Sequence, residues 1–247
     1  MRYGIISDVH SNLTALEAVI KELEGLGVDR FLCPGDVVGY GPDPSECISR
    51  IRSLDAAVVL GNHDAAVCGL LDIDWFNPFA REAVLWTRHR ISENDVKWLS
   101  MLPLSCDLET WVVVHSSLAQ PEMFPYVHSL STAKACFEQM ANWKACFIGH
   151  SHISEVYVWQ EGARGIDRIS LRDGGELQLK EGYRYILNCG SVGQPRDGNP
   201  HAACALFDTE EMTFHLLRVP YDIAEVQMRM READLPDVLI ERLEYGL

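Results

Sequence analysis

Short apolar runs alternate with stretches of helical spacing over the first third of the chain. Residues 3–8 form an apolar run, and across residues 12–27 the apolar side chains recur every three or four positions, which is typical of an amphipathic helix. Apolar runs at 30–36 and 56–64 lie on either side of a second helix start at 43–46, where a proline and a glutamate follow a capping aspartate. This alternation predicts a βαβαβ beginning with parallel strands.

The pattern changes after this beginning. Residues 72–103 carry two helix starts, at Asn77 and at Ser92, and we expect a helical insertion there. Beyond it the expected elements are buried strands at 111–116 and 146–148, a helix at 131–143, strands at 154–160, 164–171, 175–180, 184–188, 203–208 and 212–219, and two short helices from residue 222. Because no long helices separate the late strands, we expect them to form a second sheet packed beside the first.

Length and composition are those of an ordinary globular protein. The 247 residues are 47% hydrophobic and 23% charged, and no repeat or linker divides them, so we expect one domain over residues 1–247. No apolar stretch is long enough to cross a bilayer. The apolar residues 3–7 near the N-terminus are too few for a signal peptide, which makes a cytoplasmic protein with no membrane partner the expectation.

Acidic residues outnumber basic ones, 36 against 21, which gives a net charge of −15. Such a chain repels both nucleic acid and anionic membranes, so neither is expected as the main partner. A small anionic substrate stays compatible with this charge if metal ions make its site locally positive. The sequence gives no indication of a protein partner. The eight cysteines form no C-x-x-C pair, and we expect reduced core residues rather than a disulfide framework.

Polar side chains end five of the apolar runs, in the segments "IISDVH", "CPGDVVG", "LGNHD", "VVVHS" and "FIGHSH". The carboxyl ends of strands are where open α/β sheets bind their ligands. The side chains delivered there are Asp8, His10, Asp36, Asn62, His63, His115, His150 and His152. Oxygen and imidazole donors of this kind suit divalent transition metals. The other four histidines, His89, His128, His201 and His215, lack such neighbours and are expected to be ordinary surface or core residues.

The number and spacing of these donors indicate more than one ion. In an extended D-x-H or H-x-H segment, side chains two residues apart point to the same side, so one segment can hold one ion or flank a pair. The set exceeds what one tetrahedral zinc ion can use. Two ions about 3.5–4 Å apart, bridged by a carboxylate, are the arrangement that supports phosphoryl displacement by a hydroxide.

The order of these motifs resembles that of a known family. D-x-H, G-D-x-x-G, G-N-H-D, a histidine at a strand end and G-H-x-H follow one another as in the calcineurin-like metallophosphoesterase superfamily. The segments "DVHSNLTALEAV", "GDVVGYGPDP", "NPFAREAV", "NCGSVGQPRDGNP" and "VPYDI" are similar to its small bacterial and archaeal, phosphodiesterase-like branch, so the resemblance covers nearly the whole chain. It implies an α/β fold with four layers, α/β/β/α, in which helices enclose a sandwich of two mixed sheets.

The resemblance also implies a role for each residue. One ion would be held by Asp8, His10 and His152, and the other by Asn62, His115 and His150, with Asp36 bridging both. His63 would be no ligand but the general acid that protonates the leaving alkoxide, and its ordinary pKa near ~6.5 suits that work. The mixed oxygen and nitrogen donors admit manganese, iron, zinc or cobalt.

One departure from the family concerns the phosphate contact. The protein-phosphatase branch has an Asp-Arg pair after G-D-x-x, which orients the acid histidine and holds phosphate, whereas this chain has Gly39-Tyr40-Gly41. Protein phosphatase activity is therefore put in doubt, and Asp64 is a candidate for orienting His63. Arg196 is a candidate for the missing phosphate contact, because a guanidinium matches phosphate geometry, with an ordinary surface arginine as the equal alternative.

Two further segments have alternative readings. Asn12 has the place of a helix cap, which we favour, with a substrate contact as the alternative. Trp75, Phe76 and Phe79 are expected in the core, with a substrate shelf at the mouth of the site as the alternative.

The leading hypothesis is a metal-dependent phosphoesterase, a hydrolase acting on a small phosphomonoester or phosphodiester. A metal-bridging hydroxide would attack phosphorus in line while His63 protonates the leaving oxygen. The alternatives are a non-catalytic metal-binding scaffold of the same fold and a protein phosphatase. The presence of all seven ligands together with His63 weighs against a scaffold. The sequence does not identify the substrate.

Overall fold

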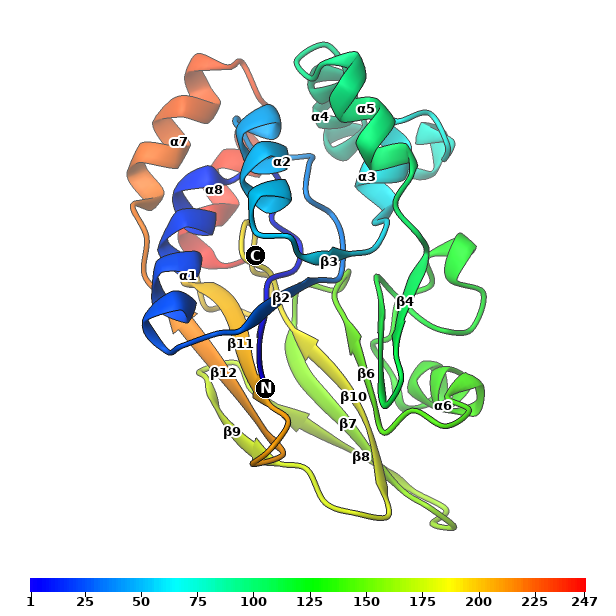
Figure 1. Cartoon of the computed structure of the whole chain (residues 1–247). Helices are drawn as coiled ribbons and strands as arrows, with labels where there is room; N and C mark the ends of the chain where they lie inside the picture. The colour runs from blue at the N-terminus through cyan, green and yellow to red at the C-terminus, as the bar shows by residue number, and fades with distance from the viewer.

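Two six-stranded sheets form the centre of the computed structural model, which describes residues 1–247 (Figure 1). The first sheet contains, in spatial order, β3 (Ala57–Val58), β2 (Arg30–Cys33), β1 (Arg2–Ile5), β11 (Ala202–Asp208), β12 (Thr213–Val219) and β9 (Gly175–Gln178). The second contains β4 (Ser105–Leu108), β5 (Trp111–Val114), β6 (Ala145–Ile148), β10 (Tyr183–Cys189), β7 (Ser154–Gln160) and β8 (Ile166–Ser170). Both sheets are mixed, since each has parallel and antiparallel neighbours.

Helices cover the outer faces of the sheets. They are α1 (Leu13–Gly25), α2 (Pro44–Ser53), α3 (Asn62–Val67), α4 (Pro78–Arg88), α5 (Glu93–Ser100), α6 (Leu130–Gln139), α7 (Ile223–Glu232) and α8 (Asp237–Tyr245), with the 3-10 turns η1 (Ile73–Trp75) and η2 (Pro121–Met123). Helix α1 packs against β11 and β12, and α6 packs against β7, β8 and β10. The predicted α/β/β/α order of layers is therefore confirmed. None of the helices combines the length and apolar character needed to cross a membrane.

The assignment of strands to sheets differs from the sequence-based expectation. The late strands do not make a sheet of their own, because β11, β12 and β9 extend the sheet begun by β1, while β5 and β6 join β10, β7 and β8. Strand β1 is parallel to β2 on one side and antiparallel to β11 on the other. A buried strand must pair at both edges, and β11 satisfies the second edge of β1.

Helix starts were more predictable than strand pairing. Asn77 accepts a hydrogen bond from the Ala80 N–H at the start of α4, and Ser92 and Asp95 form the capping box of α5, as predicted. The sequence pattern did not indicate β4 or α3. Helix α3 matters most for the site, because Asn62 and His63 lie in its first turn rather than in a loop.

Aromatic side chains join the two sheets across the central core. Phe207 of β11 lies edge-on to Trp111 of β5 and to Phe147 of β6, with ring centroids 4.9 and 5.3 Å apart. Phe207 and Phe147 are fully buried. Because the first ring belongs to one sheet and the other two to its partner, this contact fixes the spacing between the sheets.

Truncation of Phe207 tests this packing. Phe207→Ala is expected to lower the free energy of unfolding by about 3–5 kcal/mol, because it opens a cavity between the sheets. Denaturant unfolding followed by circular dichroism measures the loss. Phe79→Ala, which removes a ring that is 47% exposed, is the matched control and should change stability by less than about 0.5 kcal/mol. A loss below about 1 kcal/mol for Phe207→Ala would show that the sheets are held by other contacts.

Candidate metal centre

Hydrogen bonds between loops assemble the site beyond the strand ends. After β1 and β2 the two loops stay paired, since the Asp8 N–H donates to Gly35 O and the His10 N–H to Asp36 O, each over 3.0 Å. The loop after β6 joins them through the His150 N–H, which donates to Asp8 Oδ2 over 3.0 Å. Residues from both sheets are thereby held at one place.

Five of the expected ligands have left-handed backbone conformations. The φ angles are 53° for Asp8, 47° for His10, 52° for Asp36, 67° for His150 and 60° for His152. Such conformations cost about 1–3 kcal/mol each for residues other than glycine and persist only where the surroundings enforce them. Five such residues at one site indicate that the fold holds their side chains in these positions in spite of the unfavourable backbone conformation.

Two motif glycines let the carboxylates approach the backbone. A Cβ atom on Gly61 would overlap Asp36 Oδ1, and a Cβ atom on Gly149 would overlap Asp8 Oδ2. The glycines of "GNHD" and "GHSH" are therefore needed for the closeness of the carboxylates, not only to end a strand.

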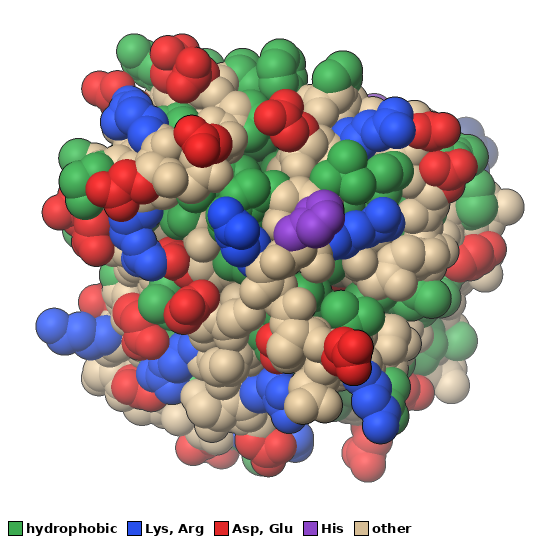
Figure 2. Space-filling view, turned by 90° about the horizontal axis from the view of Figure 1, so that it is seen from above, with side chains coloured by type: hydrophobic (Ala, Val, Ile, Leu, Met, Phe, Trp, Pro, Cys, Tyr) green, Lys and Arg blue, Asp and Glu red, His purple; other side chains and the backbone are tan.

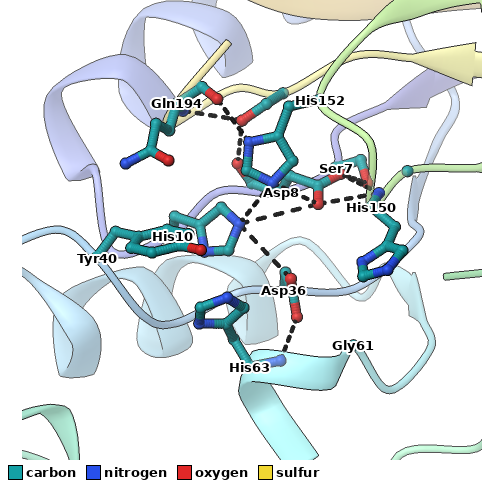
Figure 3. Close-up of polar contacts among 12 residues, drawn as sticks. Ser7, Asp8, His10, Asp36, Tyr40, Gly61, His63, His150, His152 and Gln194 are labelled. Carbon is teal, nitrogen blue, oxygen red and sulfur yellow. Dashed lines mark hydrogen bonds and ion pairs between the residues drawn. The ribbon is translucent and has the colours of Figure 1, made fainter. Parts of the chain in front are cut away.

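Asp8, His10 and His152 form the first group of donors (Figure 3). The Nε2 atoms of His10 and His152 lie 3.0 Å apart, and Asp8 Oδ1 lies 3.3 Å from His152 Nε2 and 3.9 Å from His10 Nε2. Asp8 is fixed at its other oxygen, which accepts from the Ser7 hydroxyl over 2.6 Å. All three side chains are buried.

The second group surrounds His115, which directly follows β5. His115 Nε2 lies 3.0 Å from Asn62 Oδ1, 3.1 Å from His150 Nδ1 and 3.3 Å from Asp36 Oδ2. Asp36 Oδ2 is also 3.5 Å from Nε2 of His10, which belongs to the first group. The Asp36 carboxylate thus lies between the two groups, where a bridging ligand would lie.

Backbone carbonyls determine which ring nitrogens carry the protons. Nδ1 faces Val38 O in His10 (3.1 Å), Gln194 O in His152 (2.6 Å) and Pro34 O in His115 (2.8 Å). A carbonyl only accepts, so each Nδ1 must donate, and in a neutral ring Nε2 then presents its lone pair. These lone pairs face one another and the carboxylates. Asp36 Oδ2 and His150 Nε2 are buried without any hydrogen-bond partner.

This donor set fits divalent cations. Lone pairs and anionic oxygens that converge at 3–4 Å repel one another unless a cation lies among them, and second-shell carbonyls that fix the tautomer are typical of metal-binding histidines. The chemistry of the residues therefore agrees with the expected metal site.

Electrostatics favour neutral rings at three of the histidines and a charged ring at His115, beside an ionised Asp36. Burial lowers the pKa of His10, His150 and His152 below the ordinary histidine value. Burial also opposes a charge on His115, but the adjacent Asp36 raises the pKa of that ring to about 9. Burial works against the charge of Asp36 as well, yet the imidazoles around it, His115 foremost, hold its pKa well below the usual range. A proton on His115 occupies the place among the acceptors that a metal cation would take.

His63 lies beside both groups at the start of α3. Its backbone N–H donates to Asp36 Oδ1 over 2.8 Å, and its ring is buried. Asp64, the candidate for orienting that ring, is committed elsewhere, because its carboxylate oxygens accept from the N–H groups of Val38 and Gly61. Asp64 therefore anchors the loop and the helix start and does not orient the His63 ring.

Aromatic packing and a glycine hold the His63 ring instead. Its centroid lies 4.4 Å from that of Tyr40 and 4.9 Å from that of Phe76. A Cβ atom on Gly39 would come within 2.6 Å of His63 Nδ1, so the ring fills the space that an aspartate at this position would need. Nδ1 has no hydrogen-bond partner. Burial lowers the pKa of His63 to about 4, against the raising effect of Asp36, so the ordinary value expected from sequence does not hold.

Arg196 reaches the same place from the loop after β10. Its Nη2 donates to the Tyr40 hydroxyl over 3.1 Å and to Gln194 Oε1 over 3.0 Å, and its guanidinium lies 5.5 Å from the Tyr40 ring centroid. Its Nε is buried and has no partner. The cation is held by neutral groups, which leaves its charge free for an anion.

The site opens into a cleft of about 250 Å³. Its lining comprises Tyr40, Asn62, His63, Leu71, Trp75, Phe76, Asn77, Ala80, Met123, Phe124, Tyr126, His150 and Arg196. Asn12, the other candidate for a substrate contact, does not line this cleft. Its Oδ1 accepts from the Ala15 N–H and its Nδ2 donates to Gly193 O, each over 3.0 Å, so both ends of its buried side chain are used in capping α1 and tying down a loop.

Sequence reasoning did not identify several residues of the cleft. Tyr40 was seen only as part of a turn, and Tyr126 and Met123 were not considered, because no motif or periodicity sets them apart. Trp75 was expected in the core but is 74% exposed. Its position in the segment after "GNHD" was the one available signal for a place at the mouth of the site.

Comparisons with known proteins agree with this architecture. A model of the calcineurin-like phosphoesterase superfamily domain matches residues 1–212. An uncharacterized protein of Methanocaldococcus jannaschii is 36% identical over 248 residues, covering 98% of this chain and 97% of that protein. A metallophosphoesterase from Sphaerobacter thermophilus has 40% identity and a TM-score of 0.88, covering 100% of this chain and 99% of that chain. A hypothetical protein from Pyrococcus horikoshii has the same fold at 19% identity, with a TM-score of 0.81, covering 100% of this chain and 98% of that chain.

A sandwich of two mixed sheets with carboxylates and imidazoles gathered at its strand ends defines a protein of the metallophosphoesterase class. The chain belongs to the calcineurin-like phosphoesterase superfamily.

Metal addition tests whether the converging donors attract cations. Manganese at about 100 times its dissociation constant should raise the free energy of unfolding by about 2.7 kcal/mol for each ion bound, because ions that bind only the folded chain stabilise it. Urea unfolding with and without manganese measures the gain, and a chelator should abolish it. Asp36→Asn should reduce the gain, whereas His89→Ala, at an exposed position, should leave it unchanged. Equal stability in manganese and in chelator would contradict a metal site.

Proposed function

We propose that the protein is a hydrolase that uses two divalent ions to cleave a small phosphomonoester or phosphodiester. The observation that carries this proposal is the position of Asp36, whose unpaired Oδ2 lies 3.5 Å from His10 Nε2 and 3.3 Å from His115 Nε2. A buried carboxylate that lies between two groups of imidazoles matches the demands of a two-ion site for phosphoryl transfer. The membership of the chain in a phosphoesterase superfamily supports the same conclusion.

The two groups divide the ligands. Asp8, His10 and His152 would hold one ion, Asn62, His115 and His150 the other, and Asp36 would contact both. When bound, two divalent ions supply the charge that neutralises phosphate oxygens and lower the pKa of the attacking water. Manganese, iron, zinc and cobalt all suit this donor set.

The chain's own proton donor would be His63. In the free protein burial keeps this ring neutral, with a pKa of about 4. A phosphate dianion in the cleft would lie beside the ring and raise that pKa, since a nearby opposite charge favours the imidazolium. His63 would then carry a proton for the leaving oxygen only when substrate is bound. The aromatic contacts with Tyr40 and Phe76 would keep its ring in place.

Arg196 would supply the phosphate contact that the Asp-Arg pair supplies in protein phosphatases. The guanidinium lines the cleft with His63 and His150 and has no carboxylate among its hydrogen-bond partners. Tyr40 and Gln194 hold it on one side, so donors remain for a phosphate oxygen. Tyr40, which stands where protein phosphatases have the arginine of the Asp-Arg pair, thus holds the Arg196 guanidinium in place.

Charge and the Gly39-Tyr40 segment bear on the partners. Basic side chains on the face seen in Figure 2 are interspersed with acidic and apolar ones rather than gathered into a continuous patch. With a net charge of −15, this favours a small phosphoester over a nucleic acid. The chain has Gly39-Tyr40 in place of the Asp-Arg pair of the protein-phosphatase branch, which argues against a protein phosphatase. A non-catalytic scaffold is the second candidate, and metal binding without turnover would favour it.

Removal of the His63 ring tests its role as the proton donor. His63→Ala should keep the metal content of the wild type and lower kcat by about 10²–10⁴ on an alkyl phosphoester, with a smaller loss on a nitrophenyl ester that needs no protonation. The loss of activity at alkaline pH, where the imidazolium deprotonates, should vanish in the variant. His201→Ala is the control at an exposed histidine. Undiminished turnover of the alkyl ester would remove His63 from this role.

Metal analysis tests the division of ligands. His152→Ala and His150→Ala should each retain about one ion of the two, because each removes a ligand from one group only. Elemental analysis after dialysis gives the stoichiometry, and electron paramagnetic resonance of manganese-loaded protein shows whether a coupled pair has become an isolated ion. His89→Ala should keep both ions. Loss of no ion, or of both ions, from either single variant would contradict the division.

A further inference from the structure

The mouth of the cleft is built from aromatic and apolar side chains that the proposed reaction does not use. Trp75, at the end of η1, is 74% exposed, and Met123, at the end of η2, is 54% exposed. Both line the cleft with Phe76, Phe124 and Tyr126. Exposed apolar side chains are informative where they are contiguous and line a concave site, since pockets for small molecules are lined in this way.

Two of these aromatic residues, Tyr126 and Phe76, contact residues of the proposed reaction directly. The Tyr126 ring stacks on that of His150, with centroids 3.9 Å apart and an interplanar angle of 16°. The Phe76 ring lies edge-on to His63 with centroids 4.9 Å apart. A group held against this lining would therefore lie next to a phosphate bound at His63 and His150. A single ligand can therefore reach both places.

The polar part of the cleft favours an anion next to the group that packs on the aromatic lining. Arg196 donates to the Tyr40 hydroxyl, carries an unpaired buried Nε and forms no ion pair with any carboxylate. A cation at one end and flat aromatic faces at the other suit a ligand that is anionic at one end and planar at the other. An alkyl chain would gain apolar burial there but no stacking.

The size of the cleft limits the ligand. Its volume of about 250 Å³ lies just below the roughly 300–1,000 Å³ typical of pockets for drug-sized ligands. One planar ring with its phosphate is of this order, whereas a polymer would have to extend over the acidic surface.

We propose that the cleft binds a nucleotide-type phosphoester, with the phosphate at Arg196 and the planar base against Trp75 at the mouth. This inference rests on the proposed function for the position of the phosphate, and it adds the class of substrate. Trp75 is the specificity-determining residue, because its exposed indole is the largest aromatic face in the lining. If the substrate is a nucleotide-type phosphoester, the reaction that supplies it must produce a nucleotide ester.

Binding of paired ligands tests the proposal without relying on turnover. The ligands are phosphonate analogues of AMP and of ribose phosphate, which resist hydrolysis and differ only in the base, and their dissociation constants are measured by calorimetry on the manganese-loaded full chain. The AMP analogue should bind at least about fivefold more tightly, as expected for stacking of one base. Hexylphosphonate, which is apolar but not planar, should bind more weakly than the AMP analogue, because it gains apolar burial but no stacking.

Substitution of Trp75 tests whether this residue causes the preference for the AMP analogue. Trp75→Ala should bring the AMP analogue to within about twofold of the ribose analogue and leave the affinity for the ribose analogue unchanged, because stacking alone is lost. Phe79→Ala is the matched control, since Phe79 is an exposed aromatic residue of the same segment that does not line the cleft. A wild type that does not distinguish the two analogues, a preference unchanged in Trp75→Ala, or equally tight binding of hexylphosphonate would each overturn the proposal.

The outcome separates this inference from the proposed function. Hydrolysis of phosphoesters without any preference for the base would refute the inference and leave the phosphoesterase standing. A preference for the base that depends on Trp75, in a protein inert towards all phosphoesters, would support the nucleotide site and refute the hydrolase.

Discussion

The Asp36 carboxylate is the point on which the arrangement of the molecule depends. One of its oxygens fixes the start of α3 through the His63 N–H, and the other lies between an imidazole delivered by the first sheet and one delivered by the second. A buried anionic oxygen without a hydrogen-bond partner is stable only if positive charge balances it. The relative position of the two sheets therefore determines whether both imidazoles reach this oxygen. The contacts of Phe207 with Trp111 and Phe147 hold the two sheets in their relative position.

The sequence allowed the donors to be predicted better than the fold that gathers them. Asp8, His115 and His152 could be found because each ends an apolar run, and the carboxyl ends of strands face a ligand site. The pairing of β1 with β11 could not be found, since an apolar run does not reveal its neighbour across 200 positions of chain. Nor could the left-handed conformations of the ligands, which come from hydrogen bonds between loops rather than from residue type.

The environment of His63 shows why local sequence misleads about reactivity. The residue type suggests a pKa suited to acid catalysis, but enclosure by Tyr40, Phe76 and Gly39 removes water from the ring and makes its charged form costly. A ring that is neutral in the free protein does not compete with metal ions for the nearby carboxylates. In the proposed reaction its charge would appear only with a substrate phosphate. The absence of a side chain at Gly39, a departure from the protein phosphatases, is what makes room for this arrangement.

The Tyr40 side chain connects the proposed acid with the proposed phosphate contact. Its ring packs on His63 and lies under the Arg196 guanidinium, while its hydroxyl accepts from Arg196 Nη2. One rigid aromatic residue therefore sets the distance between the proposed proton donor and the Arg196 cation. A carboxylate in the place of Tyr40 would pair with the guanidinium and neutralise its charge. Because a tyrosine leaves the guanidinium unpaired, the positive charge stays available in a chain whose net charge is −15. In the proposed function, attraction of a small phosphoester to this acidic protein would depend on the site itself, where Arg196 and metal ions would reverse the sign of the local potential.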